Sequence, residues 1–325
     1  MPRRKWEIPE SQATDEAVYL NRRKFLGRAG LGSIGLLTGC IPEKLLNPAQ
    51  LVDPKDFLAP AEPAPRYPAP LNPSFSTLDR PLTDENIAGI YNNFWEFTDT
   101  KWVTEYIDKF EPLPWTVEIT GLVEEPKTWD VEDLIGRMDL EERLYRHRCV
   151  EAWSMAIPWT GFPMKALVDL VKPLSSARYV SMNSFFNPEV APNQWDQPDY
   201  PWPYTEGLTL AEATNELTLL VTGIYGHELP KQHGAPIRLV TPWKYGFKGL
   251  KSITRIDFTE EQPATFWPTR TPSEYEFFSN VDPEVPHRRW SQAREEFITD
   301  DLDNPEVRET LLYNGYGEYV AHLYA

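Results

Sequence analysis

The sequence predicts an α+β domain in which mixed β-sheets and short helices are joined by long loops. Of the 325 residues 32 are proline, and the strand-like segments are separated by stretches rich in proline and glycine. Proline interrupts helices and is excluded from central strands, so it favours short elements and shaped loops. Hydrophobic residues make up 41% of the chain and charged residues 25%, as in ordinary globular domains.

Apolar and alternating segments give the order of the elements. Strands are expected at 115–120, 143–149, 178–184, 217–224, 236–241 and 251–259. Helices are expected near 131–137, at 163–172, where Pro163 suits a first turn, and at about 208–215. Residues 154–163 are expected to form a loop after the strand that carries Cys149. The Pro-rich, acidic tail after Thr259 is expected to wrap the domain rather than form another one.

Residues 1–40 have the features of an export signal. A basic cluster at 22–24 is followed by an uncharged, Gly-rich run from Ala29 to Pro42. This run is shorter than the ~20 apolar residues that span a bilayer, so it suits a signal peptide. The paired arginines before Lys-Phe-Leu resemble the twin-arginine signal, which exports folded proteins and often cofactor-loaded ones. The segment therefore predicts a periplasmic protein and favours a cofactor enzyme.

The end of the signal leaves two alternatives open. Residues 37–40, Leu-Thr-Gly-Cys, look like a lipoprotein cleavage box, which would leave Cys40 as a lipidated first residue and tether the protein to a membrane. Cleavage elsewhere would discard Cys40. Residues 41–82 are Pro-rich and are expected to form a linker or a surface strap. Residues 83–325 are expected to form a single domain.

The formal net charge of −17 argues against a nucleic-acid partner, because phosphate binding needs a basic surface. The chain also lacks the C-x-x-C-H spacing of covalently bound haem.

Cys149 is the only thiol besides Cys40, and a lone exported thiol is either a small buried residue or a metal ligand. Its neighbours Arg146, His147 and Arg148 are expected to favour the thiolate, which is the metal-binding form. Zinc would require several Cys or His ligands at close spacing, and the five His are scattered. A cysteine protease would need a paired His, for which no pattern is present.

Four blocks carry a resemblance to a known family. They are RCVEAWSMAIPWTGFP at 148–163, NNFWEF at 92–97, GAPIR at 234–238 leading into PWKYGFKGLKS at 242–252, and RWSQA at 289–293. In this order and spacing they resemble the sulfite oxidase superfamily. Within it they are most similar to the catalytic subunits of bacterial periplasmic protein-methionine-sulfoxide reductases. The resemblance implies a sulfite-oxidase-like molybdopterin-binding fold.

The resemblance also implies a cofactor with one pyranopterin and one molybdenum per chain, with Cys149 as the catalytic metal ligand. In the loop at 242–252, Lys244, Lys248 and Lys251 could bind a phosphate. His233 and Trp95 depart from the family pattern, which has Asn and Tyr there, although both can still donate from a ring N–H. The positions that match the family's cofactor-binding set are Asn92, Trp95, Glu96, Ser184, His233, Arg238, Gly249, Leu250 and Lys251.

The function implied is the reduction of methionine sulfoxide in oxidised envelope proteins, with oxygen transfer from the sulfoxide to molybdenum. Electrons would come from a membrane haem-b subunit and the quinone pool. Arg146, His147 and Arg148 would either tune the metal or form salt bridges with Glu141, Glu142 or Glu151. The candidates for aromatic walls of an open site are Trp153, Trp159 and Trp202.

Two alternatives remain. A sulfite oxidase would transfer oxygen in the opposite direction and would need an anion pocket lined by arginine. The second alternative is a cofactor-free envelope binding protein on the same fold, because fold alone does not prove function. Such a protein would have no use for Cys149, so the presence of Cys149 argues against it.

Overall fold

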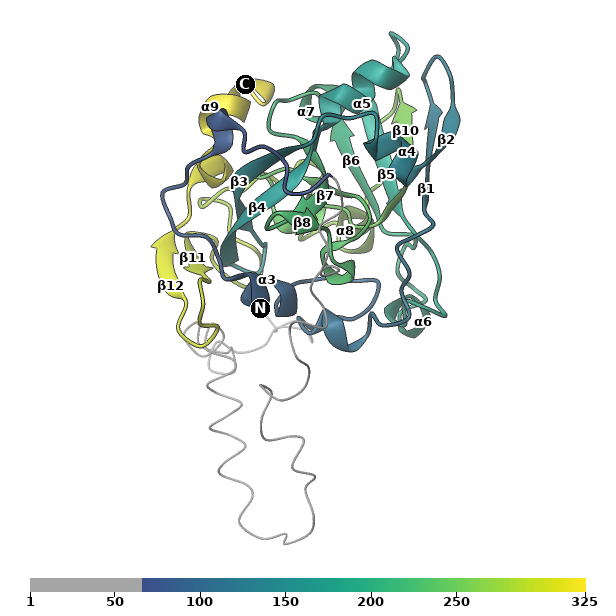
Figure 1. Ribbon diagram of the computed structural model, residues 1–325. Coiled ribbons are helices and arrows are strands. Elements are labelled where there is room, and N and C mark those ends of the chain that lie inside the picture. The colour runs from purple at the N-terminus through teal and green to yellow at the C-terminus, as the bar shows by residue number, and fades with distance from the viewer. Residues whose placement is uncertain (1–65) are drawn as a thin grey trace, which may run out of the picture. The chain divides into compact units, whose positions relative to one another are not determined.

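The structure is a computed structural model, and it describes residues 66–325 (Figure 1). The signal segment 1–40 with Cys40, and residues 41–65 of the predicted linker, lie outside the described residues. Within the described part of the chain, no helix is both long enough and apolar enough to cross a bilayer.

The first of two mixed sheets has five strands in the order β2-β1-β10-β5-β6. Only β1 and β10 run parallel to each other, and the other neighbours are antiparallel. Helices α4 and α5 pack against this sheet and bury its apolar side chains in the first hydrophobic cluster. The strands are β1 (Thr116–Gly121), β2 (Lys127–Asp130), β5 (Tyr179–Ser184), β6 (Thr205–Thr209) and β10 (Ile253–Thr259).

The second sheet has seven strands and is organised around β4, which pairs with β3 and β7 and runs parallel to β11. Strand β12 extends the sheet beyond β11, while β8 and β9 pair with β7. The strands are β3 (Glu141–Arg148), β4 (Trp153–Pro163), β7 (Leu219–Ile224), β8 (His227–Glu228), β9 (Arg238–Val240), β11 (Arg294–Phe297) and β12 (Glu306–Glu309).

The sequence-based prediction of a loop at 154–163 is wrong, because these residues belong to β4. Ten successive residues of β4 are buried, so the strand shows none of the alternation that marks a half-buried strand. Pro158 and Gly161 also suggest a loop. Pro158 lacks an N–H donor, and its carbonyl accepts a hydrogen bond from the Tyr225 amide.

The helices are short, as the proline content predicts, and the α+β class is confirmed. Capping side chains start several of them: Asp84 accepts from two amides of α3, Asp130 does so for α4, and Thr209 forms a capping box with Glu212 at α7. The α-helices are α3 (Glu85–Ile90), α4 (Val131–Ile135), α5 (Met164–Val171), α6 (Asn193–Asp196), α7 (Leu210–Ala213), α8 (Phe266–Arg270) and α9 (Gly317–Val320). The 3-10 helices are η5 (Pro73–Phe75), η6 (Val103–Glu105), η7 (Lys231–His233), η8 (Gly246–Lys248), η9 (Leu312–Gly315) and η10 (Ala321–Leu323).

The residues at 66–82, here called the N-terminal strap, pack on the second sheet. The Tyr67 hydroxyl donates to the carbonyl of Thr222 at 2.8 Å, and Leu71 pairs with Glu142 of β3. The C-terminal elements α9, β11 and β12 lie along one side of the domain (Figure 1). The strap and the tail therefore both border β3, the strand that leads to Cys149.

Candidate active site

Cys149 occupies a tight turn between β3 and β4. The Ala152 amide donates to the Cys149 carbonyl at 3.0 Å, and the Cys149 amide donates to the Trp153 carbonyl at 2.9 Å. Ala152 has a positive φ of 69°, which a residue other than glycine adopts only when its surroundings enforce it. The eight-residue pairing of β3 with β4 supplies that constraint and fixes the position of the thiol.

Two residues, Asn93 and Glu151, contact the Cys149 sulfur. Asn93 Nδ2 lies 3.6 Å and the Glu151 amide nitrogen 3.5 Å from Sγ, and both are N–H donors. The Glu151 carboxylate pairs with Lys101 at 2.5 Å and also accepts from Asn93 at 3.2 Å. Burial opposes ionisation of Glu151, but the Lys101 ammonium outweighs it and lowers the pKa of the carboxyl.

The expectation that the neighbouring basic residues favour the thiolate is wrong for the protein alone. Burial, with a smaller effect from the Glu151 carboxylate, raises the pKa of the Cys149 thiol to about 12. His147 is not positively charged either, because burial and then Arg238 lower its pKa to about 3. A bound metal ion is what would stabilise the thiolate here.

Arg146 and Arg148 serve as anchors, and their carboxylate partners are not the ones proposed from the sequence. Arg146 pairs with Asp79 of the N-terminal strap at 3.0 Å. Arg148 is fully buried, donates to the Cys149 carbonyl and pairs with Glu295 of β11 at 3.2 Å. Glu295 also pairs with Arg80 of the strap at 2.7 Å. The Cys149 turn is therefore held from both the strap and the tail.

The residues matched to the cofactor-binding set come together from four separate segments. Lys251 links three of these segments, because its Nζ donates to Asn92 Oδ1 at 3.1 Å, to the Asn93 carbonyl at 2.6 Å and to the Gln232 carbonyl at 2.7 Å. Phe94, between Asn93 and Trp95, is fixed in a cluster of phenylalanine rings that packs under the loop. The set occupies the 92–96 loop, the end of β5 at Ser184, the η7–β9 region at His233 and Arg238, and the 249–251 turn before β10.

Arg238 lies at the centre of the set. Its guanidinium donates to the carbonyls of His233 at 2.9 Å and Gly249 at 3.2 Å, and lies 4.9 Å from the Trp159 ring centre. Leu250 differs from the others because its side chain is buried in the first hydrophobic cluster. Its amide and carbonyl bond to Lys248 and Leu239, so the Leu250 side chain does not face the set.

Two of the three lysines proposed to bind phosphate are already paired. Lys244 contacts the Glu212 carboxylate at 2.5 Å, and Lys248 contacts the Glu206 carboxylate at 2.5 Å, with all four side chains almost completely buried. The prediction is therefore wrong for Lys244 and Lys248. Lys251 has no carboxylate within ion-pair distance in the described part of the chain.

The remaining buried cations fit an anionic cofactor. Burial lowers the pKa of Arg238 to about 9, and burial together with Arg238 lowers that of Lys251 well below its usual value. Within residues 66–325 both cations donate only to carbonyl or amide oxygens, and no carboxylate is paired with either. Uncompensated buried charges are costly, so this arrangement suits an external anion such as the pterin phosphate.

Unpaired ring donors support the same conclusion. Trp95 Nε1 and Trp159 Nε1 are buried, and neither has a hydrogen-bond partner among the described residues. Burial raises the pKa of the neighbouring Glu96 to about 7, although Ser184 and Lys251 act in the opposite direction. The residues present therefore offer cations and N–H donors of the kind that a phosphorylated pterin requires.

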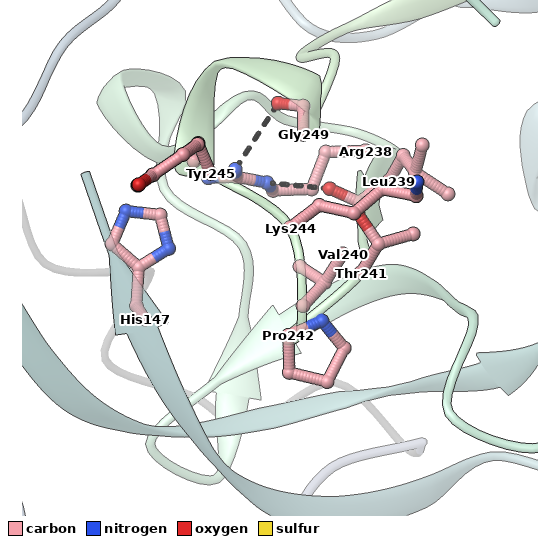
Figure 2. Close-up of a pocket in the computed structure, with 10 residues that line it drawn as sticks. His147, Arg238, Leu239, Val240, Thr241, Pro242, Lys244, Tyr245 and Gly249 are labelled. Carbon is pink, nitrogen blue, oxygen red and sulfur yellow. Dashed lines mark hydrogen bonds between the residues drawn. The ribbon is translucent and has the colours of Figure 1, made fainter. Parts of the chain in front are cut away.

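Figure 2 shows a small pocket that Arg238 and Gly249 of this set help to line. Its lining includes the Arg238 side chain and Gly249, which are joined by a hydrogen bond, and the His147 ring rises from β3 towards the turn that carries Tyr245. Because His147 and Cys149 are two residues apart, the pocket lies close to the proposed metal ligand.

The aromatic residues proposed as walls have other positions. Trp153 and Trp159 are buried in the second hydrophobic cluster, and Trp202 packs on Phe266 at the first. Trp153 nevertheless lies beside the thiol, because its Nε1 donates to the Glu151 carboxylate at 3.1 Å, and Trp290 Nε1 donates to the carbonyl of Val150 at 2.7 Å. Sequence analysis quoted the block at 289–293 that contains Trp290 but assigned it no role at the site.

Sequence analysis also missed the group formed by Asn93, Lys101 and Glu151. Asn93 and Glu151 adjoin residues already selected, so their proximity along the chain was an available signal. Lys101 has no such signal, because only the fold brings it to Glu151.

The chain matches known proteins along its whole length. The family model "Oxidoreductase molybdopterin binding domain" matches residues 104–267. The protein-methionine-sulfoxide reductase catalytic subunit MsrP of Burkholderia mallei is 43% identical over 98% of this chain and 93% of its own length. The subunit of the same name from Ralstonia nicotianae is 43% identical over 98% of this chain and 94% of its own.

Among solved structures, the sulfane dehydrogenase SoxCD of Paracoccus pantotrophus is 16% identical, with a TM-score of 0.40 over 47% of this chain and 40% of its own. The Burkholderia mallei subunit is 43% identical over nearly the whole of this chain, and the matched family domain includes Cys149. These two matches show the family of this chain. The chain belongs to the family of protein-methionine-sulfoxide reductase catalytic subunits and contains their molybdopterin-binding oxidoreductase domain.

Proposed function

We propose that this chain reduces methionine sulfoxide in other proteins with one molybdopterin cofactor, whose single molybdenum is bound by Cys149. The names of the relatives support the substrate. The main structural observation is that Arg238 and Lys251 are buried and, within residues 66–325, donate only to carbonyl or amide oxygens. The reaction breaks the sulfoxide S–O bond, consumes two electrons and two protons, and releases a thioether and water.

The protein's part in this reaction is to position groups and to exclude water. When bound, the cofactor supplies the two-electron oxygen-atom transfer that amino-acid side chains cannot provide. Cys149 anchors it, and the N–H groups of Asn93 and Glu151 direct hydrogen bonds at the sulfur. Arg148 fixes the main chain at Cys149. Asn92, Trp95, Glu96, Ser184, His233, Arg238, Lys251 and the main chain at 249–250 would hold the pterin and its phosphate.

The charges around the thiol favour a neutral sulfoxide over sulfite. The anion pocket of a sulfite oxidase needs free arginine side chains, but Arg146 and Arg148 are paired with Asp79 and Glu295. The charged groups nearest the sulfur are Glu151 and its partner Lys101, which neutralise each other. A neutral substrate is compatible with this environment, whereas Lys101 is already paired with Glu151 and is not free to bind a sulfite dianion.

The proposal includes export and an electron donor. Residues 1–40 would direct export of the folded protein to the periplasm by the twin-arginine route, and residues 41–82 would link the signal to the domain at 83–325. A membrane haem-b subunit would supply electrons from quinol, and a lipidated Cys40 would keep the two subunits together. The absence of a C-x-x-C-H motif from the sequence is consistent with an external donor.

The first experiment measures molybdenum per chain for the wild type and Cys149→Ser, both purified from a host that makes molybdopterin. About one molybdenum per wild-type chain and much less in the variant is expected, because a hydroxyl is a poor replacement for a thiolate ligand. Assays of sulfoxide reduction and sulfite oxidation on the loaded wild type then fix the substrate. A folded wild-type protein without molybdenum would overturn the proposal and favour a binding protein.

A further inference from the structure

The position of His147 on β3 suggests a role of its own. Side chains two residues apart on a strand project from the same face, so His147 shares a face with Cys149 at the strand end. Arg146 projects the other way and pairs with Asp79 of the N-terminal strap. The segment 146–148 therefore has two faces. Arg146 is directed at a structural carboxylate, and His147 is directed at the pocket that Arg238 also lines.

The His147 ring has no hydrogen-bond partner within residues 66–325, and it lines the pocket together with Arg238 and Gly249 (Figure 2). Two other histidines differ, because His227 and His287 each reach a glutamate. A histidine that only fills the core would be expected to use its ring nitrogens in the same way.

Gly246 shows that the ring has a defined place. A Cβ at this glycine would lie 2.6 Å from His147 Cε1 and 2.7 Å from Nε2, so any larger residue would displace the ring. Glycine here lets the 245–249 turn approach the imidazole closely. On its other side the ring contacts Trp153, with centroids 5.5 Å apart. The imidazole is thus held between β4 and the turn while one edge borders the pocket.

We infer that His147 is a further cofactor-binding residue, whose ring N–H donates a hydrogen bond to an acceptor atom of the molybdopterin. A neutral imidazole carries one such donor in either tautomer. The inference rests on the proposed function, because it requires that the cofactor occupies this site. It gives the second residue of the RHRC sequence a task distinct from those of Arg146 and Arg148.

The test compares His147→Phe, which keeps a ring but removes the donor, with His147→Gln, which keeps a donor. His322→Phe, at an exposed histidine of η10, is the matched control. Molybdopterin and molybdenum per chain are measured on freshly purified protein and again during dilution at elevated temperature. Urea unfolding of each chain from a host without molybdopterin reports on the fold alone.

Loss of one buried hydrogen bond corresponds to roughly a tenfold loss of affinity, so His147→Phe is expected to release its cofactor about tenfold faster than wild type. His147→Gln should recover much of the retention, and His322→Phe should retain cofactor like the wild type. Wild-type retention in His147→Phe would overturn the inference. So would equal losses in both His147 variants accompanied by an equal drop in cofactor-free stability, because His147 would then support only the fold. A wild-type chain without cofactor would instead overturn the proposed function.

Discussion

Two pairs of buried cations lie within residues 238–251, and they differ in their partners. Lys244 and Lys248 each contact a buried glutamate, whereas Arg238 and Lys251 donate only to neutral oxygens among the described residues 66–325. The first pair is complete within the protein, and the second pair becomes electrically balanced only when an anion arrives. The difference teaches that a basic loop can combine structural and ligand-binding charges. Carboxylates elsewhere in the fold determine which cations are neutralised within the protein and which remain to bind a ligand.

The largest expected effect comes from breaking a completed pair. Lys248→Met leaves the Glu206 carboxylate buried without its cation, which costs about 3–5 kcal/mol of folding stability. Urea unfolding of the cofactor-free chain measures this loss. Lys248→Met combined with Glu206→Leu should recover most of it, since no buried charge remains. If Lys248→Met alone were as stable as the wild type, the distinction between Lys244 and Lys248 on one side and Arg238 and Lys251 on the other would have no energetic basis.

Lys251→Met should affect cofactor retention more than folding. Removing a cation that faces the cofactor site is expected to reduce molybdopterin retention roughly tenfold to a hundredfold. Because no buried carboxylate loses its partner, the cofactor-free chain should lose much less stability than Lys248→Met does. Molybdopterin content and urea unfolding are measured on the same preparations. If Lys251→Met were as destabilising as Lys248→Met and retained its cofactor, the two pairs would not differ in kind.

The pH dependence of stability tests the same region through Glu96. Its pKa is raised by burial to about 7 in the folded chain, from 4.5, so the folded state keeps a proton that the unfolded state has lost between these values. The contribution of Glu96 to the free energy of unfolding is therefore fully present below pH 4.5 and is lost as the pH rises to about 7.

Relative to Glu96→Gln, the cofactor-free wild type should lose on the order of 2 kcal/mol between pH 4.5 and 7. Urea unfolding at several pH values gives this difference. Curves for the two proteins that stay parallel would show that Glu96 titrates normally.

The smallest effect is expected from an exposed pair. Lys165 and Asp169 are one helical turn apart on α5, and both side chains are more than half exposed. Lys165→Met should change stability by less than about 0.5 kcal/mol and leave cofactor content unchanged, because water and salt screen such pairs. It also serves as a matched lysine control for Lys248→Met and Lys251→Met. A loss of several kcal/mol at this position would mean that lysine removal is harmful irrespective of burial.

The sequence predicts strands well where hydrophobic and polar residues alternate. The expected strands at 115–120, 143–149 and 178–184 correspond to β1, β3 and β5 within a few residues. The long central strand β4 was missed because it is buried throughout, and β11 was missed because its sequence, REEF, is mostly charged. Tertiary pairing, and not local pattern, makes these two segments strands.

The site was predictable where its chemistry is unusual. Cys149 stands out as the only cysteine after the signal segment, and the positions around Arg238 and Lys251 came from the resemblance. The partners of the lysines were not predictable, because Glu206 and Glu212 lie on β6 and α7, far from Lys244 and Lys248 in sequence. A basic segment shows where cations are but not which of them have already been neutralised.

The network of Arg80, Glu295 and Arg148 has a consequence for how the protein is made. Glu295 lies close to the C-terminus, Arg80 lies in the strap, and both secure the turn that presents Cys149. A nascent chain still on the ribosome has not yet placed β11 beside β4, so its turn lacks this support. Assembly of the metal ligand's surroundings therefore requires β11, which is synthesised long after β3 and β4.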